Sequence, residues 1–275
     1  MEKPEGGEVM KVIELHGARV PAIGLGTWDL RGEEGYQAVL SALSLGYRHI
    51  DTAEFYDNER EVGKAVKDSG VPRDVVFLTT KVWYTHLHFQ DLIRSCEESL
   101  RKLGTDYIDL YLIHWPNEAV PLEESLSAME KLQKEGKVRF VGVSNFDVDL
   151  LDKARNIAPF PILTDQVEYH PYLSQKPLLE YCQKHKVILT AYSPLARGRL
   201  SQDPLLCSIA EKYGKTVSQV VLRWLIEQDM VVAIPKAKDP KHQRENLEIF
   251  DFSLSEDEKE AISRLDRGEK VATRL

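Results

Sequence analysis

Apolar runs alternate with amphipathic stretches along most of the chain. Eight runs rich in Val, Ile, Leu and aromatic residues have the length and composition of buried strands. The eight runs lie at residues 22–27, 47–52, 75–82, 107–115, 138–145, 162–169, 187–194 and 231–236. Between them, residues 32–46, 122–136 and 216–228 repeat apolar side chains at helical spacing and carry end signals such as Thr216 and Gly136. Eight β-α alternations in roughly 250 residues predict a (β/α)8 TIM barrel, whose functional groups gather at the carboxyl ends of the strands.

Two further elements flank these repeated units. Residues 12–21 predict a β-hairpin with a tight turn at His16-Gly17, and residues 255–266 predict an added C-terminal helix. No linker, low-complexity stretch or short repeat divides the chain. We therefore expect residues 1–275 to form a single domain, a barrel with an N-terminal β-hairpin and an extra C-terminal helix.

Single positions disfavour two other α/β arrangements. A doubly wound sheet with a dinucleotide fingerprint requires a third glycine after Gly24 and Gly26, and Asp29 stands in that place. A nucleophile elbow at Ser144 requires a glycine two positions later, and Phe146 stands there. The barrel therefore remains the predicted fold.

The composition narrows the classes of function. The chain has 275 residues, of which 43% are hydrophobic and 29% are charged, and its net charge is -8. This charge and the lack of a basic stripe argue against binding to nucleic acids or to membrane surfaces. Charged residues interrupt every apolar run before the roughly 18 residues that a spanning helix requires, and residues 1–11 lack the apolar core of a signal peptide. We expect a soluble, cytoplasmic protein.

The cysteines and two neighbouring histidines give little support to a metal site. Cys96, Cys182 and Cys207 are odd in number and widely spaced, so we expect three buried thiols and neither a disulfide framework nor a zinc site. His86 and His88 leave a metal-dependent hydrolase as an alternative, but an HxH pair on a loop is more often solvated or packed than metal-bound. We predict no metal site.

Four ionisable side chains stand at or just beyond the ends of predicted strands. They are Asp51, Tyr56, Lys81 and His114. Asp, Lys and His are rarely buried unless they are paired, and the ends of parallel strands converge in space. We therefore expect the four side chains to share one pocket.

Such a set could polarise and protonate a carbonyl group. We expect the Lys81 ammonium to lower the pKa of Tyr56, and Asp51 to keep Lys81 charged. A neutral His114 could donate a hydrogen bond to the carbonyl oxygen. No amino-acid side chain supplies hydride, so carbonyl reduction at this site would require a nicotinamide or a flavin.

Six motifs extend this interpretation to nearly the whole chain. In order along the sequence they are IDTAEFYDNEREVG, KVW, LYLIHWP, VGVSNF, AYSPL and IPKA. Their order and approximate spacing resemble those of the aldo-keto reductase superfamily, over a region from about Ala22 to about Phe252. The resemblance implies a (β/α)8 barrel that binds NADP or NAD in extended form. It also implies reversible, NAD(P)H-dependent reduction of aldehydes and activated ketones to alcohols.

The resemblance assigns roles to the four clustered residues. Tyr56 would be the proton donor, Lys81 and Asp51 would tune it, and His114 would orient the carbonyl. A noncatalytic nicotinamide-binding regulatory or sensor protein is the alternative, because the fold alone does not exclude it. The intact set of four favours the enzyme. Family habit favours a monomer that acts on a small-molecule substrate.

The same resemblance implies the residues that contact the cofactor and the substrate. Ser144, Asn145 and Gln166 would hydrogen-bond the nicotinamide carboxamide, and Tyr192 would stack on its ring. The implied cofactor contacts are Thr27, Trp28, Ser144, Asn145, Gln166, Tyr192, Ser193, Leu195, Lys236, His242, Glu245 and Asn246. The implied substrate pocket consists of Trp28, Phe55, Trp83, His114 and Trp115. Ser144 and Asn145 could instead cap the following helix.

The segment that would bind the adenosine end departs from the NADP pattern. NADP-preferring relatives carry serine or threonine after the lysine and an arginine six positions after it, but here Ala237 and His242 occupy these places. A neutral imidazole cannot replace the bidentate grip of a guanidinium on the 2′-phosphate, although Lys238 and Arg244 lie close in sequence. We therefore expect use of both NADP(H) and NAD(H). The segment beyond Asp266 is short, so we also expect an open pocket mouth.

Overall fold

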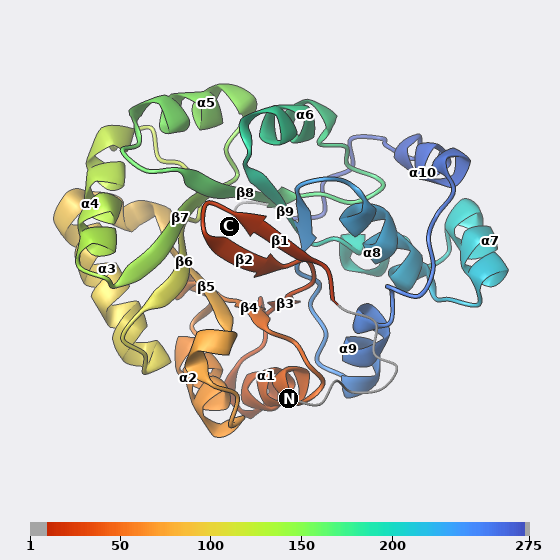
Figure 1. Ribbon diagram of the computed structural model, residues 1–275, viewed down its shortest axis with the longest axis horizontal. Helices are drawn as coiled ribbons and strands as arrows, with labels where there is room; N and C mark the ends of the chain where they lie inside the picture. The colour runs from red at the N-terminus through yellow and green to blue at the C-terminus, as the bar shows by residue number, and fades with distance from the viewer. Residues whose placement is uncertain (1–9, 273–275) are drawn as a thin grey trace.

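The computed structural model describes residues 10–272, which form a (β/α)8 barrel (Figure 1). Within these residues, eight parallel strands stand side by side in chain order. The strands are β3 (Leu25–Gly26), β4 (His49–Asp51), β5 (Phe77–Val82), β6 (Ile108–Ile113), β7 (Val138–Ser144), β8 (Ile162–Glu168), β9 (Ile188–Tyr192) and β10 (Val231–Ala233). A parallel bridge between Ile23 and Ala233 joins the first strand to the last. The predicted strands and fold class are confirmed.

Helices surround the strands. They are α1 (Gly32–Ser44), α2 (Glu59–Asp68), α3 (Phe89–Leu103), α4 (Leu122–Lys134), α5 (Val148–Ile157), α6 (Lys176–His185), α7 (Pro204–Tyr213), α8 (Val217–Glu227), α9 (Pro240–Leu247) and α10 (Glu256–Ser263). Short 3₁₀ helices are η1 (Glu54–Tyr56), η2 (Arg73–Val75), η3 (Tyr84–His86) and η4 (Ala196–Gly198). Thr216 caps α8 in a capping box with Gln219, as its sequence predicts. α7 is an extra helix that we did not predict.

The extra helix α7 carries the one cysteine that is exposed among the three. Cys96 and Cys182 are buried, but Cys207 is exposed. The prediction of three buried thiols is therefore wrong for Cys207. The reason is that α7 lies outside the ring and buries only one face, through Leu206, Ile209 and Ala210.

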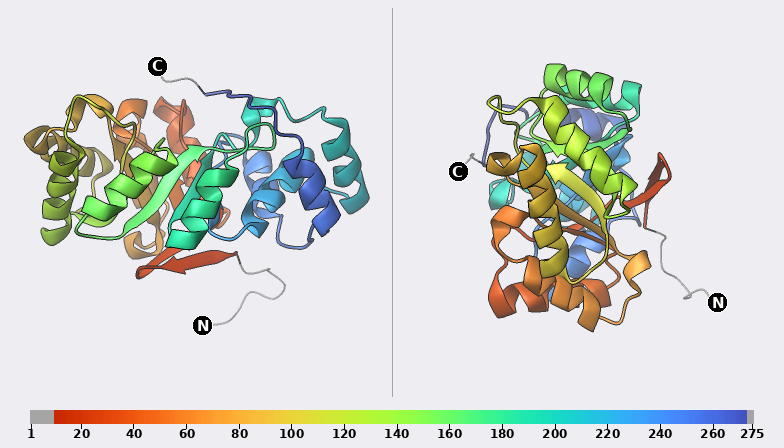
Figure 2. Two further views of the ribbon diagram at one scale, coloured as in Figure 1. Left: turned by 90° about the horizontal axis from the view of Figure 1, so that it is seen from above. Right: turned by 90° about the vertical axis from the view of Figure 1, so that its left-hand side faces the viewer.

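An antiparallel hairpin covers the amino-terminal end of the barrel. It consists of β1 (Val12–Leu15) and β2 (Ala18–Pro21). His16 and Gly17 both have positive φ angles, 50° and 83°, as a two-residue hairpin turn with this twist requires. Figure 2 shows the hairpin on one side of the barrel and the segment that follows α10 on the opposite side. The carboxyl ends of the strands are thus left free to form a site.

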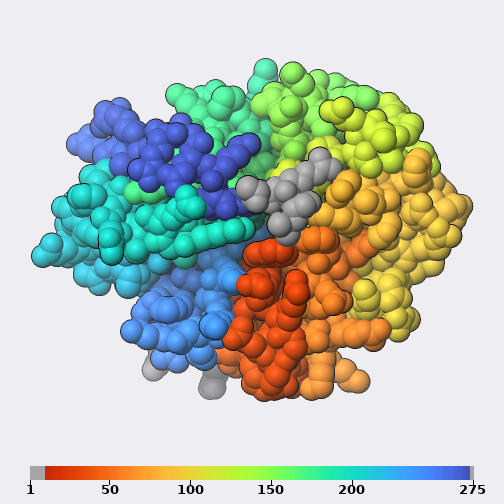
Figure 3. Space-filling model, turned by 180° about the vertical axis from the view of Figure 1, so that it is seen from behind, coloured from red at the N-terminus to blue at the C-terminus, as the bar shows by residue number. Residues whose placement is uncertain are grey.

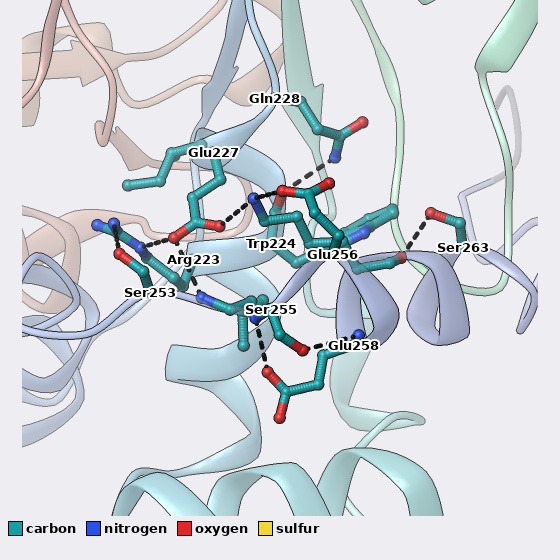
Figure 4. Close-up of polar contacts among 12 residues, drawn as sticks. Arg223, Trp224, Glu227, Gln228, Ser253, Ser255, Glu256, Glu258 and Ser263 are labelled. Carbon is teal, nitrogen blue, oxygen red and sulfur yellow. Dashed lines mark hydrogen bonds and ion pairs between the residues drawn. The ribbon is translucent and has the colours of Figure 1, made fainter.

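Ionic and backbone contacts fix the last helix to α8 (Figure 4). Glu227 Oε1 accepts hydrogen bonds from Arg223 Nε at 2.5 Å and from the backbone N–H of Leu254 at 3.3 Å. Lys259 of α10 lies 3.1 Å from the other oxygen of Glu227. Ser255 begins α10 with a capping box. The predicted C-terminal helix is therefore confirmed, and it is anchored by α8.

At Gly63, helix α2 packs closely against the end of α3. Gly63 packs so closely there that an added Cβ atom would overlap the backbone carbonyl of Leu103. A glycine inside a helix normally destabilises it by about 0.5–1 kcal/mol relative to alanine. Close packing of the two backbones is therefore the reason for this glycine.

We predict that Gly63→Ala destabilises the protein by at least about 2 kcal/mol, because the overlap with rigid backbone outweighs the gain in helix propensity. Urea unfolding would measure the change. Lys64→Ala, at the exposed neighbouring position, is the control and should shift the free energy of unfolding by less than about 0.5 kcal/mol. A more stable Gly63→Ala protein would contradict the packing argument.

Candidate active site

The carboxyl ends of the strands surround a cavity of about 660 Å³. It lies on the side of the barrel away from the hairpin. Figure 3 shows this side, where the red and orange amino-terminal segments meet the cyan and blue carboxyl-terminal segments. Asp51, Tyr56 and His114 line the cavity, and Lys81 lies beneath it. The structure therefore brings the four clustered residues together.

A buried ion pair lies under the cavity. Lys81 is completely inaccessible to solvent, and its Nζ lies 2.5 Å from Asp51 Oδ1 and donates to the Thr52 carbonyl at 2.8 Å. Gln166 Nε2 donates to the second oxygen of Asp51 at 2.8 Å. A buried charge is strongly destabilising unless it is paired and hydrogen-bonded. Here Asp51 on β4, Thr52 directly after it and Gln166 on β8 supply the compensation for Lys81 on β5.

Tyr56 rests on this ion pair. It ends the 3₁₀ helix η1, and its hydroxyl lies 3.4 Å from Lys81 Nζ. Burial raises the pKa of Tyr56 well above 10.0, and the negative charge of Asp51 raises it further. The predicted net lowering of this pKa is therefore wrong, because burial and the charge of Asp51 outweigh any stabilisation of the phenolate by the ammonium. The phenol keeps its proton at neutral pH.

His114 faces Tyr56 across the cavity floor. It follows β6, and its ring meets the Tyr56 ring edge to face at a centroid distance of 5.5 Å. Burial lowers the pKa of His114 well below 6.5, and the charge of Lys81 lowers it further. Its Nδ1 is buried without a hydrogen-bond partner among residues 10–272. The imidazole is therefore neutral at neutral pH and can donate one hydrogen bond.

Aromatic rings form one wall of the cavity. Phe55 stacks on Trp83 with centroids 3.9 Å apart, and Trp28 lies parallel to Phe55 at 6.2 Å. Trp83 in turn contacts the His114 ring edge to face at 5.1 Å. The predicted substrate residues that line the cavity are Trp28, Phe55, Trp83, His114 and Trp115. Such a wall suits apolar or amphipathic ligands.

Polar residues predicted to contact a cofactor lie on the adjoining wall. Tyr192 Oη donates to Asn145 Oδ1 at 2.8 Å, and Asn145 Nδ2 donates to the His114 carbonyl at 3.0 Å. The predicted cofactor residues that line the cavity are Thr27, Trp28, Asn145, Gln166, Tyr192, Ser193, Leu195 and Lys236. Those placed outside its lining are Ser144, His242, Glu245 and Asn246.

Ser144 and Asn145 do not cap the following helix. Asp147 is the N-cap of α5, and its side chain accepts a hydrogen bond from the Leu150 backbone N–H. Ser144 Oγ instead donates to the carbonyl of Gln166 at 2.7 Å. The capping alternative is therefore wrong, and both side chains are available to organise the cavity wall.

The cavity has lining residues that sequence reasoning missed. They are Gly26, Asp29, Pro194, Arg197, Gly198, Leu200, Ser201, Val217, Ser218, Val221, Ile234, Pro235 and Ala272. Asp29 and Arg197 have positive φ angles of 60° and 52°, so tight turns bring them to the mouth. Arg197 and Arg199 flank Gly198 shortly after β9. This pair of arginines near the end of a strand is the sequence signal that could have identified Arg197.

The carboxyl-terminal segment reaches the cavity mouth. Glu168 accepts hydrogen bonds from the backbone N–H groups of Val271 at 2.6 Å and Ala272 at 2.9 Å, while His170 Nε2 lies 2.9 Å from the same carboxylate. Ala272 is part of the cavity lining. A short tail held by Glu168 therefore contributes to the cavity lining, and the expected open mouth stays a prediction.

The two histidines of the HxH pair contact different carboxylates. His86 Nδ1 lies 2.5 Å from Glu54, and His88 Nδ1 lies 3.3 Å from Glu124. Among residues 10–272, no three His, Cys, Asp or Glu side chains are grouped so that they could hold a metal ion. In the same part of the chain, no helix combines the length and apolar character needed to cross a membrane.

Known proteins resemble the chain over almost its whole length. The family model for the Aldo/keto reductase family matches residues 22–267. Glyoxal reductase of Bacillus subtilis (strain 168) is 42% identical, with 94% of each chain covered. Methylglyoxal reductase DkgB of Escherichia coli O157:H7 is 40% identical, with 92% of this chain and 96% of that protein covered. The crystal structure of a Bombyx mori aldo-keto reductase in complex with NADP has a TM-score of 0.91 at 33% identity, covering 97% of this chain and 96% of that one.

A second buried acid lies behind the cavity wall. Asp165 on β8 is fully buried, and its Oδ1 accepts only a long hydrogen bond of 3.5 Å from the Phe146 backbone N–H. Its Oδ2 has no partner among residues 10–272. Burial raises the pKa of Asp165 well above its ordinary value of 3.8. Folding thus favours the protonated form of Asp165. The stability that this form contributes is full below the ordinary pKa and is lost as the pH rises toward the raised pKa.

We predict that Asp165→Asn raises the free energy of unfolding at pH 7. At that pH the wild-type protein must either bury an ionised carboxylate or bind a proton that the unfolded chain lacks, and the neutral amide requires neither. The difference from wild type should disappear as the pH falls below about 4. Urea unfolding at several pH values would measure it. Asp109→Asn is the matched control and should destabilise the protein, since Asp109 pairs with Arg73 at 2.7 Å and Arg139 at 3.2 Å. A loss of stability in both variants would contradict the prediction.

Proposed function

Because the chain belongs to the aldo/keto reductase family, we propose that the cavity is its active site and Tyr56 its proton donor. The protein is an NAD(P)-dependent oxidoreductase that reduces carbonyl groups of aldehydes and activated ketones to alcohols, in a reversible reaction. The observation that carries the residue assignment is the 3.4 Å contact between Tyr56 Oη and the buried Lys81 ammonium, beside a neutral His114.

Each residue in this cluster has one task in the proposed mechanism. His114 donates a hydrogen bond to the carbonyl oxygen and holds it beside Tyr56. Tyr56 transfers its phenolic proton to that oxygen as the carbon is reduced. Lys81 stabilises the phenolate that results, and Asp51 with Gln166 keeps Lys81 in position. The transfer leaves a phenolate over Lys81, and Tyr56 must regain a proton from water before it can act again.

The cavity fits a nicotinamide dinucleotide. At about 660 Å³ it offers aromatic surface at Tyr192, amide groups at Asn145 and Gln166, and a cation at Lys236. When bound, the nicotinamide supplies the hydride. The proposed contacts are Asn145, Gln166 and Ser144 with the carboxamide, Tyr192 with the ring, Thr27, Trp28, Ser193 and Leu195 with the middle of the molecule, and Lys236, His242, Glu245 and Asn246 with the adenosine end.

The adenosine segment and the named relatives narrow the proposed cofactors and substrates. The Bombyx mori relative binds NADP, and Ala237 with His242 at the adenosine segment supports additional use of NAD(H). The relatives named glyoxal and methylglyoxal reductases support small oxoaldehydes as substrates beside larger apolar aldehydes. We also propose that residues 1–275 act as one domain and as a monomer in the cytoplasm, which size-exclusion chromatography and cell fractionation would test.

We predict that Tyr56→Phe lowers kcat by at least about 100-fold while the affinity for NADPH changes little, because only the transferable proton is removed. Consumption of NADPH with methylglyoxal and a panel of aldehydes would give kcat, and quenching of tryptophan fluorescence would give the affinity. Tyr36→Phe is the control, since the Tyr36 hydroxyl donates to the exposed Asp68 at 2.9 Å and Tyr36 is not part of the cavity lining. Unchanged turnover in Tyr56→Phe would remove Tyr56 from the mechanism. NADPH binding by the wild type without any turnover would instead support the sensor.

We predict that His242→Arg tightens NADPH binding by about tenfold and changes NADH binding little, because a guanidinium binds the 2′-phosphate through charge-assisted hydrogen bonds. Titration of both nucleotides by fluorescence would measure the change. His185→Arg adds the same charge on α6, outside the cavity lining, and should change neither affinity. A wild-type preference for NADPH of several orders of magnitude would contradict dual use.

A further inference from the structure

Two lysines at the proposed adenosine end are already paired with carboxylates. Lys236 Nζ lies 3.8 Å from Asp29 Oδ2, and both residues line the cavity. Lys238 Nζ lies 2.9 Å from Glu34 Oε2. Both lysines come from the segment between β10 and α9, whereas both carboxylates come from the turn after β3 and the first turn of α1. Figure 3 shows the red segment and the blue segment side by side on this face.

Buried hydrogen bonds hold the two segments against each other. Gln243 of α9 is completely buried, and its Nε2 donates to the Ala38 carbonyl of α1 at 2.8 Å. Tyr47 Oη donates to the Gln243 carbonyl at 2.9 Å. These contacts keep α1 close to α9. The backbone that carries Glu34 is therefore held close to the segment that carries the two lysines.

The turn that carries Asp29 is also fixed. Buried Asn58 donates through Nδ2 to the carbonyls of Thr27 and Leu30, each at 2.8 Å. Asp29 between them has a φ angle of 60°, a conformation that Asp and Asn tolerate better than most residues. Its side chain is consequently presented at the cavity mouth beside Lys236.

We propose that Asp29 and Glu34 set the cofactor preference by neutralising Lys236 and Lys238. The two carboxylates repel the 2′-phosphate of NADPH and compete with it for the lysines, whereas NADH lacks that phosphate and is little affected. The inference rests on the proposed function, because it requires the adenosine end of the cofactor to lie at Lys236. It adds two specificity-determining residues on α1 and the turn before it, away from the segment that the sequence motif identifies.

The charges set the size of the effect. A phosphate monoester carries roughly 1.5 to 2 negative charges at pH 7, and interactions shorter than the Debye length of about 8 Å are only partly screened at physiological salt. Asp29 and Glu34 have side chains that are 66% and 55% exposed, so water weakens their influence. We therefore expect removal of one charge to change NADPH affinity by about threefold and removal of both by about tenfold.

The test compares Asp29→Asn, Glu34→Gln and the double variant with a matched control. Glu33→Gln removes the same charge from the same helix turn, but Glu33 bonds to Gln37 within the helix at 2.7 Å and to neither lysine. Fluorescence titration would give the dissociation constants for NADPH and NADH at low and high salt. We expect tighter NADPH binding in the three test variants, nearly unchanged NADH binding, and loss of the difference at high salt.

Other outcomes have separate meanings. Equal changes for both nucleotides, no change, or the same change in Glu33→Gln would overturn the role of Asp29 and Glu34 while leaving the proposed function intact. A wild-type protein that binds neither nucleotide would overturn the proposed function and this inference with it. Glu34→Gln lies on the surface of α1 and keeps the proposal testable if Asp29→Asn fails to fold.

Discussion

The buried ion pair between Lys81 and Asp51 is the interaction on which the rest of the structure depends. Lys81 has no exposed surface, so the barrel can close around it only if partners from several strands meet there. Asp51, the Thr52 carbonyl and Gln166 provide that compensation, and the same arrangement places the ammonium against the Tyr56 hydroxyl. Folding and the proposed proton transfer would therefore share one set of contacts, and a change that loosens the ion pair would affect both.

Burial gives this site its electrostatic character. Two groups of the cavity lining, the phenol of Tyr56 and the imidazole of His114, are neutral at neutral pH because desolvation opposes their charged forms. The ammonium of Lys81 lies beneath them and is paired with Asp51. In the proposed mechanism a carbonyl compound would therefore meet two neutral hydrogen-bond donors, and the ammonium beneath them would respond when a phenolate forms.

Local signals explain which features could be predicted from the sequence. The strands, the His16-Gly17 turn and the convergence of the four ionisable residues follow from apolar periodicity, turn chemistry and parallel topology. The pKa of Tyr56 was predicted with the wrong sign, because its direction depends on the depth of burial and not on neighbours in sequence. Asp29, Arg197 and Ala272 were missed for a related reason. Their approach to the cavity depends on turns and on a long-range hydrogen bond that no periodic pattern records.

The attachment of the tail to Glu168 has a consequence for the evolution of the pocket. Glu168 binds main-chain N–H groups of Val271 and Ala272, so it can hold any residue there except proline, which lacks that donor. The side chain at position 272 is consequently uncoupled from the anchoring of the tail, although it lines the mouth. Natural drift or a directed library at this one codon can reshape the entrance while the barrel, the ion pair and the chemistry stay as they are.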